Sequence, residues 1–175
     1  LEFYLHILAS LPAGVGRLLL VDSRDVLFQA DPFSGLKDAP LEFFDENDDT
    51  GSWTLLTTNG RWARTMLPGR MVAMLKGKPI VNGGVIAGTP EGLAAMCRAK
   101  LDIALATHEW TKHTTGLDNI STNVVAHGRL VPGAVATRNH THVANVYRGT
   151  AMTLDAAGHI ASPGGKACPI VHMYD

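Results

Sequence analysis

The chain has 175 residues, of which 46% are hydrophobic and 18% are charged, and its formal net charge is −1. This length is typical of one domain with a substantial core, so we expect residues 1–175 to form a single α/β domain. The near-neutral charge gives no reason to expect nucleic acid as a partner, and the apolar runs are too short to span a membrane. We therefore expect a soluble domain without a membrane segment.

The N-terminal segment leaves the compartment open. Leu1–Leu11 is apolar, but it contains Glu2 and His6 and has no basic leading region, so it is not a signal peptide. The chain does not begin with Met, which indicates a fragment from which an upstream anchor could have been lost. The lumen of the secretory pathway and the cytoplasm both remain open as the location.

The first half of the chain predicts helices and strands separated by an acidic loop. The continuous apolar run at Arg17–Val21, RLLLV, is typical of a strand buried on both faces. The first predicted element in chain order is a helix at Glu2–Ser10 that packs through Phe3, Leu5, His6 and Leu8. The strand at Arg17–Val21 comes next, with its continuation at Val26–Phe28, followed by an acidic loop at Asp38–Gly51. A strand at Trp53–Thr57 and a helix at Arg61–Leu75, broken by Pro68 and Gly69, complete this half.

The second half predicts a strand at Pro79–Gly88, a helix at Thr89–Thr107 and a helix at Gly116–His127, followed by short strands within residues 131–137, 141–147, 159–165 and 169–175. The helix at Thr89–Thr107 has the clearest signals, because Thr89 can cap its start and Pro90 suits its first turn. Five residues recur there at helical spacing: Leu93, Met96, Cys97, Leu101 and Leu105. The alternation of strands and helices predicts a mostly parallel sheet flanked by helices, with a small antiparallel addition near the end.

Charged residues follow the apolar strand at Leu18–Val21. Asp22 comes directly after the strand and Asp25 three residues later, at the strand end where open α/β sheets bind ligands. Two such carboxylates suit Mg²⁺ or Mn²⁺ bound together with substrate phosphates, and Arg24 between them could contact the same phosphates. The alternative is a turn in which Arg24 neutralises the carboxylates.

The segment Leu18–Phe33, LLLVDSRDVLFQADPF, resembles the metal-binding strand of nucleotide-diphospho-sugar transferases of the GT-A fold, with an Asp-x-x-Asp variant of their Asp-x-Asp motif. Three later segments resemble further motifs of that family in the same order. Val81–Ile86 is similar to its Asn-x-Gly-Val strand, Gly116–Asn123 to its Asp-Gln-x-x-x-Asn helix start, and Ile170–Asp175 to its late histidine segment. The family's first nucleotide-binding strand has no counterpart here, so the resemblance implies a GT-A-like fold that is incomplete at its N-terminus.

The resemblance also implies a site. Asp22, Asp25 and His172 would hold Mn²⁺ or Mg²⁺, with Asp25 the more direct ligand and Asp22 binding either the metal or the donor. The substrate-binding residues would be Asp22, Arg24, Asn82, Gly83, Gly84, Asp118 and Asn119, where Asn119 stands in place of the family's Gln. Asp118 would bind sugar hydroxyls or act as a catalytic base on the acceptor.

Each of these residues also has a purely structural interpretation. His172 could be a buried imidazole with satisfied hydrogen bonds, and Asn82 could serve a β-bulge at Gly83 and Gly84. Asp118 could simply stabilise the first turn of a helix.

The resemblance implies a metal-dependent glycosyltransferase that moves a sugar from a nucleotide-diphosphate donor to an acceptor hydroxyl. One alternative is a non-catalytic carbohydrate-binding or degenerate domain of the same fold. Another is a phosphohydrolase of the haloacid dehalogenase type, which also begins with an apolar strand ending in Asp. Such an enzyme needs a second Asp two positions later, where this chain has Arg24.

Overall fold

The computed structural model describes residues 1–46, 58–107, 116–147, 151–162 and 164–174. The helices in these ranges are α1 (Glu2–Ala9), α2 (Thr58–Met66), α3 (Gly69–Leu75), α4 (Pro90–Ala106) and α5 (Leu117–His127). The strands are β1 (Leu18–Val21), β2 (Val26–Phe28), β3 (Leu41–Asp45), β4 (Val81–Gly88), β5 (Val135–Thr137), β6 (Val143–Tyr147), β7 (Thr153–Leu154), β8 (Ile160–Ala161) and β9 (Ile170–Tyr174). In this part of the chain, no helix has the length and apolarity needed to span a membrane.

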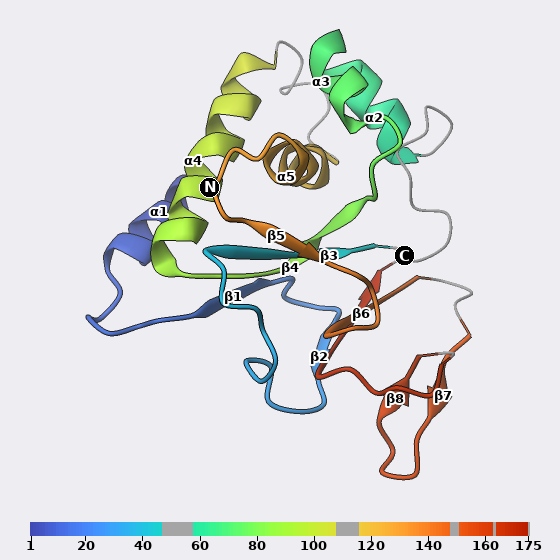
Figure 1. The fold of residues 1–175 in the computed structure, drawn as a ribbon. Helices are drawn as coiled ribbons and strands as arrows, with labels where there is room; N and C mark the ends of the chain where they lie inside the picture. Colours follow the sequence, from blue (N-terminus) through green and yellow to red (C-terminus); the bar gives the residue numbers. More distant parts are fainter. Residues whose placement is uncertain (47–57, 108–115, 148–150, 163, 175) are drawn as a thin grey trace.

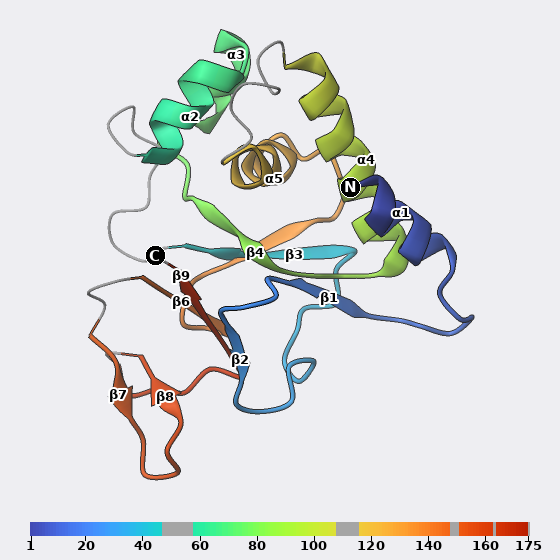
Figure 2. The same ribbon diagram turned by 180° about the vertical axis from the view of Figure 1, so that it is seen from behind.

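A four-stranded sheet with the order β1-β4-β3-β5 lies in the middle of the molecule. The helices lie on one side of it (Figures 1 and 2). Leu41 and Phe43 of β3 and Ile86 of β4 belong to the apolar core that this sheet shares with the helices. The class is therefore α/β, as predicted.

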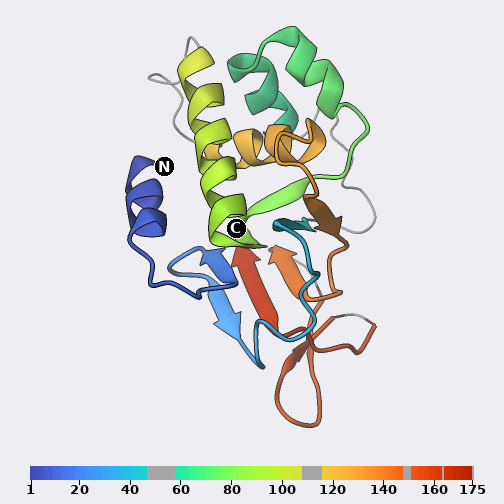
Figure 3. The same ribbon diagram turned by 60° about the vertical axis from the view of Figure 1, so that its left-hand side comes forward.

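A three-stranded sheet with the order β2-β9-β6 lies on the other side of the four-stranded sheet (Figures 1 and 3). A second apolar core joins the two sheets through Phe44 and Val85 of the first and Val143 and Ile170 of the second. β7 and β8 form a separate antiparallel pair, which is the small antiparallel addition that the sequence predicts near its end.

Local sequence signals place the helices well. Thr89 caps α4 by accepting a hydrogen bond from the amide of Gly92 at 3.1 Å, and Pro90 begins the helix. The predicted break at Pro68 and Gly69 is confirmed, because α2 ends at Met66 and α3 begins at Gly69. In α1, Leu5 and Leu8 pack against the core as expected, but Phe3 is 71% exposed.

The prediction of a mostly parallel sheet is wrong for the described strands. β4 runs antiparallel to both β1 and β3, and the pairs β2–β9 and β7–β8 are also antiparallel. Among the strand pairs in the described ranges, β3–β5 and β6–β9 are the parallel ones. The apolar run predicted that β1 is buried on both faces, but all four of its residues are only half-buried, with Leu18 and Leu20 toward the helices and Leu19 and Val21 toward the second sheet. Parallel strands are joined by helical crossovers, which would have placed a second layer of helices on this face; a sheet lies there instead.

The prediction of an acidic loop at Asp38–Gly51 is also wrong in part, because Leu41–Asp45 forms the buried strand β3. The charge of Glu42 favoured an exposed loop in the sequence. The Glu42 carboxylate is nevertheless buried, and it accepts hydrogen bonds from the Lys37 amide, at 2.8 Å, and from the Thr137 hydroxyl. The strand predicted at Trp53–Thr57 lies outside the described residues.

Candidate functional site

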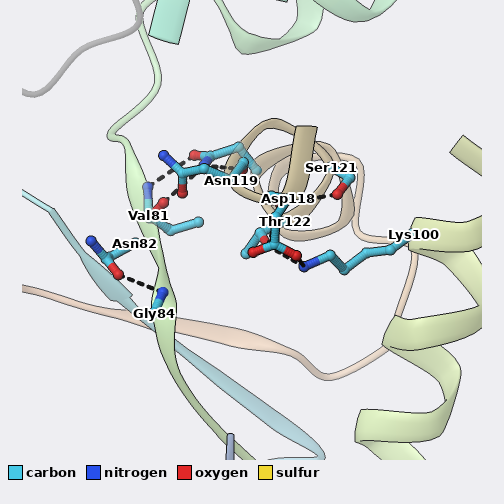
Figure 4. Close-up of polar contacts among 9 residues, drawn as sticks. Val81, Asn82, Gly84, Lys100, Asp118, Asn119, Ser121 and Thr122 are labelled. Carbon is cyan, nitrogen blue, oxygen red and sulfur yellow. Dashed lines mark hydrogen bonds and ion pairs between the residues drawn. The ribbon is translucent and has the colours of Figure 1, made fainter. Parts of the chain in front are cut away.

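A bulge in β4 brings the glycines of the Val81–Ile86 segment to the end of β1. The pairing of β3 with β4 shifts between Phe43, opposite Ile86, and Phe44, opposite Asn82. The Asn82 side chain accepts a hydrogen bond from the Gly84 amide at 2.6 Å (Figure 4), and the Asp22 amide donates to the Gly84 carbonyl at 2.8 Å. The bulge therefore ties the acidic end of β1 to Gly84.

Asp22, Asp25 and His172 come together at this point. Each offers one ligand atom, and the three atoms lie within 4.8 Å of one another. Nε2 of His172 is 3.3 Å from Oδ2 of Asp22 and 3.8 Å from Oδ1 of Asp25. The imidazole is 2% exposed, whereas the Asp22 side chain is 58% exposed, so the cluster has a buried nitrogen and a solvent-facing carboxylate.

Two features of the cluster are compatible with a divalent cation. Oδ1 of Asp25 is buried and accepts no hydrogen bond from any described residue, although a buried carboxylate oxygen normally has a donor or a cation beside it. Gly84 leaves open the space between the ligands, because a Cβ there would lie 2.5 Å from Oδ2 of Asp22 and 2.6 Å from Nε2 of His172. Two carboxylates and one imidazole form a ligand set compatible with Mn²⁺.

The pKa of His172 decides whether its imidazole is neutral and so able to bind a metal ion. Burial lowers the pKa of His172 below its usual value, and the nearby charges of Asp22 and Asp25 oppose this shift. A neutral imidazole whose lone pair faces two carboxylates is repelled by them, and a cation between them would relieve that repulsion.

The pH dependence of metal binding follows from the direction of this shift. A proton competes with the metal for His172, and its lowered pKa means that protonation begins only below the usual imidazole value of about 6.5. We expect the Mn²⁺ affinity, measured by isothermal titration calorimetry, to stay constant from about pH 8 to about pH 6.5 and to fall below that. An affinity that already falls steeply between about pH 8 and about pH 6.5 would instead indicate an imidazolium paired with the two carboxylates.

A pocket of about 170 Å³ adjoins the metal-ligand cluster and shares Asp22 with it. Its other lining consists of Gly83, Lys100 and Asp118, of Tyr4 on α1 with the preceding Leu1, and of side chains of β1, β4 and α4. This volume is below the roughly 300–1,000 Å³ of pockets for drug-sized ligands, so the pocket suits one small ring.

An ion pair lies at the wall of the pocket (Figure 4). Nζ of Lys100, on α4, is 2.7 Å from Oδ1 of Asp118 and donates to Oγ1 of Thr122 at 2.8 Å. The Lys100 side chain is 4% exposed and that of Asp118 is 69% exposed. The pair therefore joins a buried cation to a carboxylate that a ligand can reach.

Sequence reasoning missed Lys100. The predicted stripe of α4 continued through Leu101 and Leu105, but the buried face runs through Leu93, Met96, Cys97, Lys100 and Ile103, and Leu105 is 67% exposed. A lysine at position 100 interrupts a stripe that is otherwise apolar at a period of 3.6 residues. That interruption is the sequence signal that could have revealed a buried cation.

The other predicted residues take different places. Arg24 is exposed and makes no hydrogen bond or ion pair with any described residue, so the internal salt bridge considered for this turn does not form. Asn82 has the bulge geometry that the sequence left open, while its substrate role stays a prediction. Asn119 donates to Oδ1 of Asn59 at 3.3 Å, and its own Oδ1 is buried without a hydrogen bond to a described residue.

Asn123, at the end of the Gly116–Asn123 motif, connects α5 to β4. Its side chain accepts from the Val81 amide at 2.9 Å and donates to the Val81 carbonyl at 2.8 Å. The motif thus holds the start of α5 against β4, and a Cβ on Gly83 would lie only 3.0 Å from Oδ2 of Asp118.

No protein-family model matches this chain, and a comparison with curated proteins finds no match. The motifs and the geometry of the cluster and the pocket are therefore the features that bear on function.

Proposed function

We propose that this chain is the catalytic domain of a metal-dependent glycosyltransferase with a GT-A-like arrangement, which moves a sugar from a nucleotide-diphosphate donor to an acceptor hydroxyl. The observation that carries the proposal is the shared position of Asp22, which belongs both to the metal-ligand cluster and to the pocket. Asp22, Asp25 and His172 would hold the metal that binds a donor diphosphate, and the adjoining pocket would receive the attached sugar. The four motifs contribute to one place in the fold, which supports the family resemblance.

Asp22, Asp25 and His172 would hold Mn²⁺ or Mg²⁺, which supplies positive charge to a departing diphosphate. Arg24 is exposed beside the two carboxylates and makes no ion pair with them, so its guanidinium is available to the same phosphates. Cations placed in this way favour the transition state, since negative charge develops on the leaving group.

Asp118 and Lys100 would recognise the sugar. Oδ1 of Asp118 is engaged by Lys100, and Oδ2 accepts no hydrogen bond from a described residue. Lys100 has three N–H donors, of which two are directed to Asp118 and Thr122. A sugar hydroxyl can therefore donate to Asp118 while a neighbouring one accepts from Lys100. This arrangement favours sugar binding over the alternative role of Asp118 as a base, because its charge is already matched by the ammonium.

The proposal is tested by thermal shift with a panel of nucleotide-diphosphate sugars, each with and without Mn²⁺. We expect the Tm to rise with at least one donor only when Mn²⁺ is present, because the diphosphate binds through the metal. Slow metal-dependent hydrolysis of that donor should release the nucleoside diphosphate.

The variant Asp25→Asn should remove the donor-dependent shift, because it removes a metal ligand. Asp102→Asn changes an exposed carboxylate on α4, far from the ligands in sequence, and should keep the shift. If no donor stabilises the protein with Mn²⁺, or if Asp25→Asn leaves the shift intact, the transferase proposal is wrong.

A carbohydrate-binding domain without catalysis is the second candidate. The pocket and the Lys100–Asp118 pair favour it, because they offer a donor and acceptors for a sugar without the metal. Free monosaccharides that raise the Tm equally with and without Mn²⁺, together with donors that are never hydrolysed, would support this candidate over the transferase.

A further inference from the structure

We infer that Asn145 is a positioning residue that holds His172 in the tautomer with a proton on Nδ1, so that the Nε2 lone pair is presented to the metal. The inference rests on the metal site of the proposed function, but it concerns a residue that none of the four motifs contains. Asn145 lies on β6 directly opposite His172 on β9, in a parallel register. Paired residues of adjacent strands project to the same face, so the two side chains meet.

The hydrogen bonds of Asn145 determine which of its atoms faces His172. Nδ2 of Asn145 donates to the main-chain carbonyl of Asp45 at 2.9 Å, and a carbonyl can only accept. The amide nitrogen is therefore directed at β3, and Oδ1 is the atom that lies 2.9 Å from Nδ1 of His172. Because Oδ1 can only accept, Nδ1 must carry the proton, and the neutral ring then has its lone pair on Nε2.

Asn139 holds the main chain of Asn145 in place. Its Oδ1 accepts from the Asn145 amide at 2.7 Å, and its Nδ2 donates to the Asn145 carbonyl at 3.0 Å and to the Glu46 carbonyl at 3.2 Å. Asn139 and Asn145 are 6% and 1% exposed. This buried amide network leaves Asn145 little freedom to rotate and reverse the polarity of its bond to His172.

The tautomer of His172 decides whether a proton or a metal ion lies between Nε2 and the carboxylate of Asp22. With the proton on Nε2, His172 would donate toward Oδ2 of Asp22, 3.3 Å away, and the cluster would close without a metal. With the proton on Nδ1, the same nitrogen is a ligand. Groups that orient a ligating histidine in this way typically change metal affinity about 10–100-fold when they are removed.

The direct test is the tautomer of His172 in the metal-free protein, measured by long-range ¹H–¹⁵N NMR above pH 7. We expect the Nδ1–H form in the unsubstituted chain and a shift toward the Nε2–H form in Asn145→Leu. The Mn²⁺ affinity of Asn145→Leu, measured by calorimetry, should be about 10–100-fold lower. Asn145→Asp is the matched variant, because it keeps an oxygen acceptor for Nδ1 and should retain the tautomer.

The inference is overturned if His172 of the unsubstituted chain is in the Nε2–H form, a result that needs no variant to fold. It is also overturned if Asn145→Leu keeps both the tautomer and the affinity. Neither measurement uses a sugar donor, so the inference and the proposed function can fail separately. A chain that binds Mn²⁺ through the Nδ1–H tautomer but engages no donor would refute the function alone.

Discussion

Replacing Gly84 with alanine is expected to abolish the Mn²⁺ binding proposed for Asp22, Asp25 and His172. The new Cβ would lie 2.5 Å from Oδ2 of Asp22 and 2.6 Å from Nε2 of His172, closer than real Cβ contacts, and so would fill the space between the ligands. The Cβ would also lie 2.5 Å from Cε1 of the buried His172, so the imidazole must shift as well as the exposed Asp22 side chain. We expect the affinity to fall about 100-fold or more, at the upper end of what losing a well-placed ligand partner costs.

Gly84 does not have a positive φ and its carbonyl bond to Asp22 needs no particular side chain, so we expect any loss of stability to come from the shift of His172. Gly69→Ala is the matched control, since a Cβ at position 69 meets nothing within 4 Å. Calorimetry with Mn²⁺ and thermal unfolding of both variants separate a blocked site from an unfolded chain. Equal affinities of Gly84→Ala and Gly69→Ala would show that no metal binds between Asp22 and His172.

Removing Asp118 is expected to destabilise the protein much more than removing its partner Lys100. Asp118→Ala leaves the buried ammonium of Lys100 without a counter-charge, and an unmatched buried charge costs about 3 kcal/mol or more in the free energy of unfolding. Lys100→Met leaves a carboxylate that is 69% exposed and stays hydrated. Because methionine fills a similar apolar volume, we expect a loss below about 1.5 kcal/mol.

Urea unfolding of the two variants measures this asymmetry, with Asp102→Ala on the exposed face of α4 as a control that should change the free energy of unfolding by less than about 0.5 kcal/mol. The sugar-binding role adds a second readout. Lys100→Met should remain folded and yet lose the donor-dependent thermal shift. If Lys100→Met is the less stable variant, the pair stabilises α4 against α5, and Lys100 has no role in the pocket.

Much of the local structure could be predicted because its causes are local. The cap at Thr89, the proline at the start of α4 and the break at Pro68 each act within a few residues. The strand direction could not be predicted in this way, since β1 has the same apolar pattern whether its neighbour is parallel or antiparallel. Glu42 is a similar case, because its burial depends on the Lys37 amide and on Thr137, which is 95 positions away along the chain.

The sequence by itself determined which residues are candidates for the site: the carboxylates after an apolar strand, the glycine pair, the acidic start of α5 and the late histidine. Only the tertiary structure decided how they are arranged, because distances between β1, β4 and β9 depend on the pairing and packing of two sheets. It also added Lys100 and Asn145, whose roles have no signature in a short motif. The role proposed for each depends on a contact with a residue distant in the chain, Lys100 with Asp118 and Asn145 with His172.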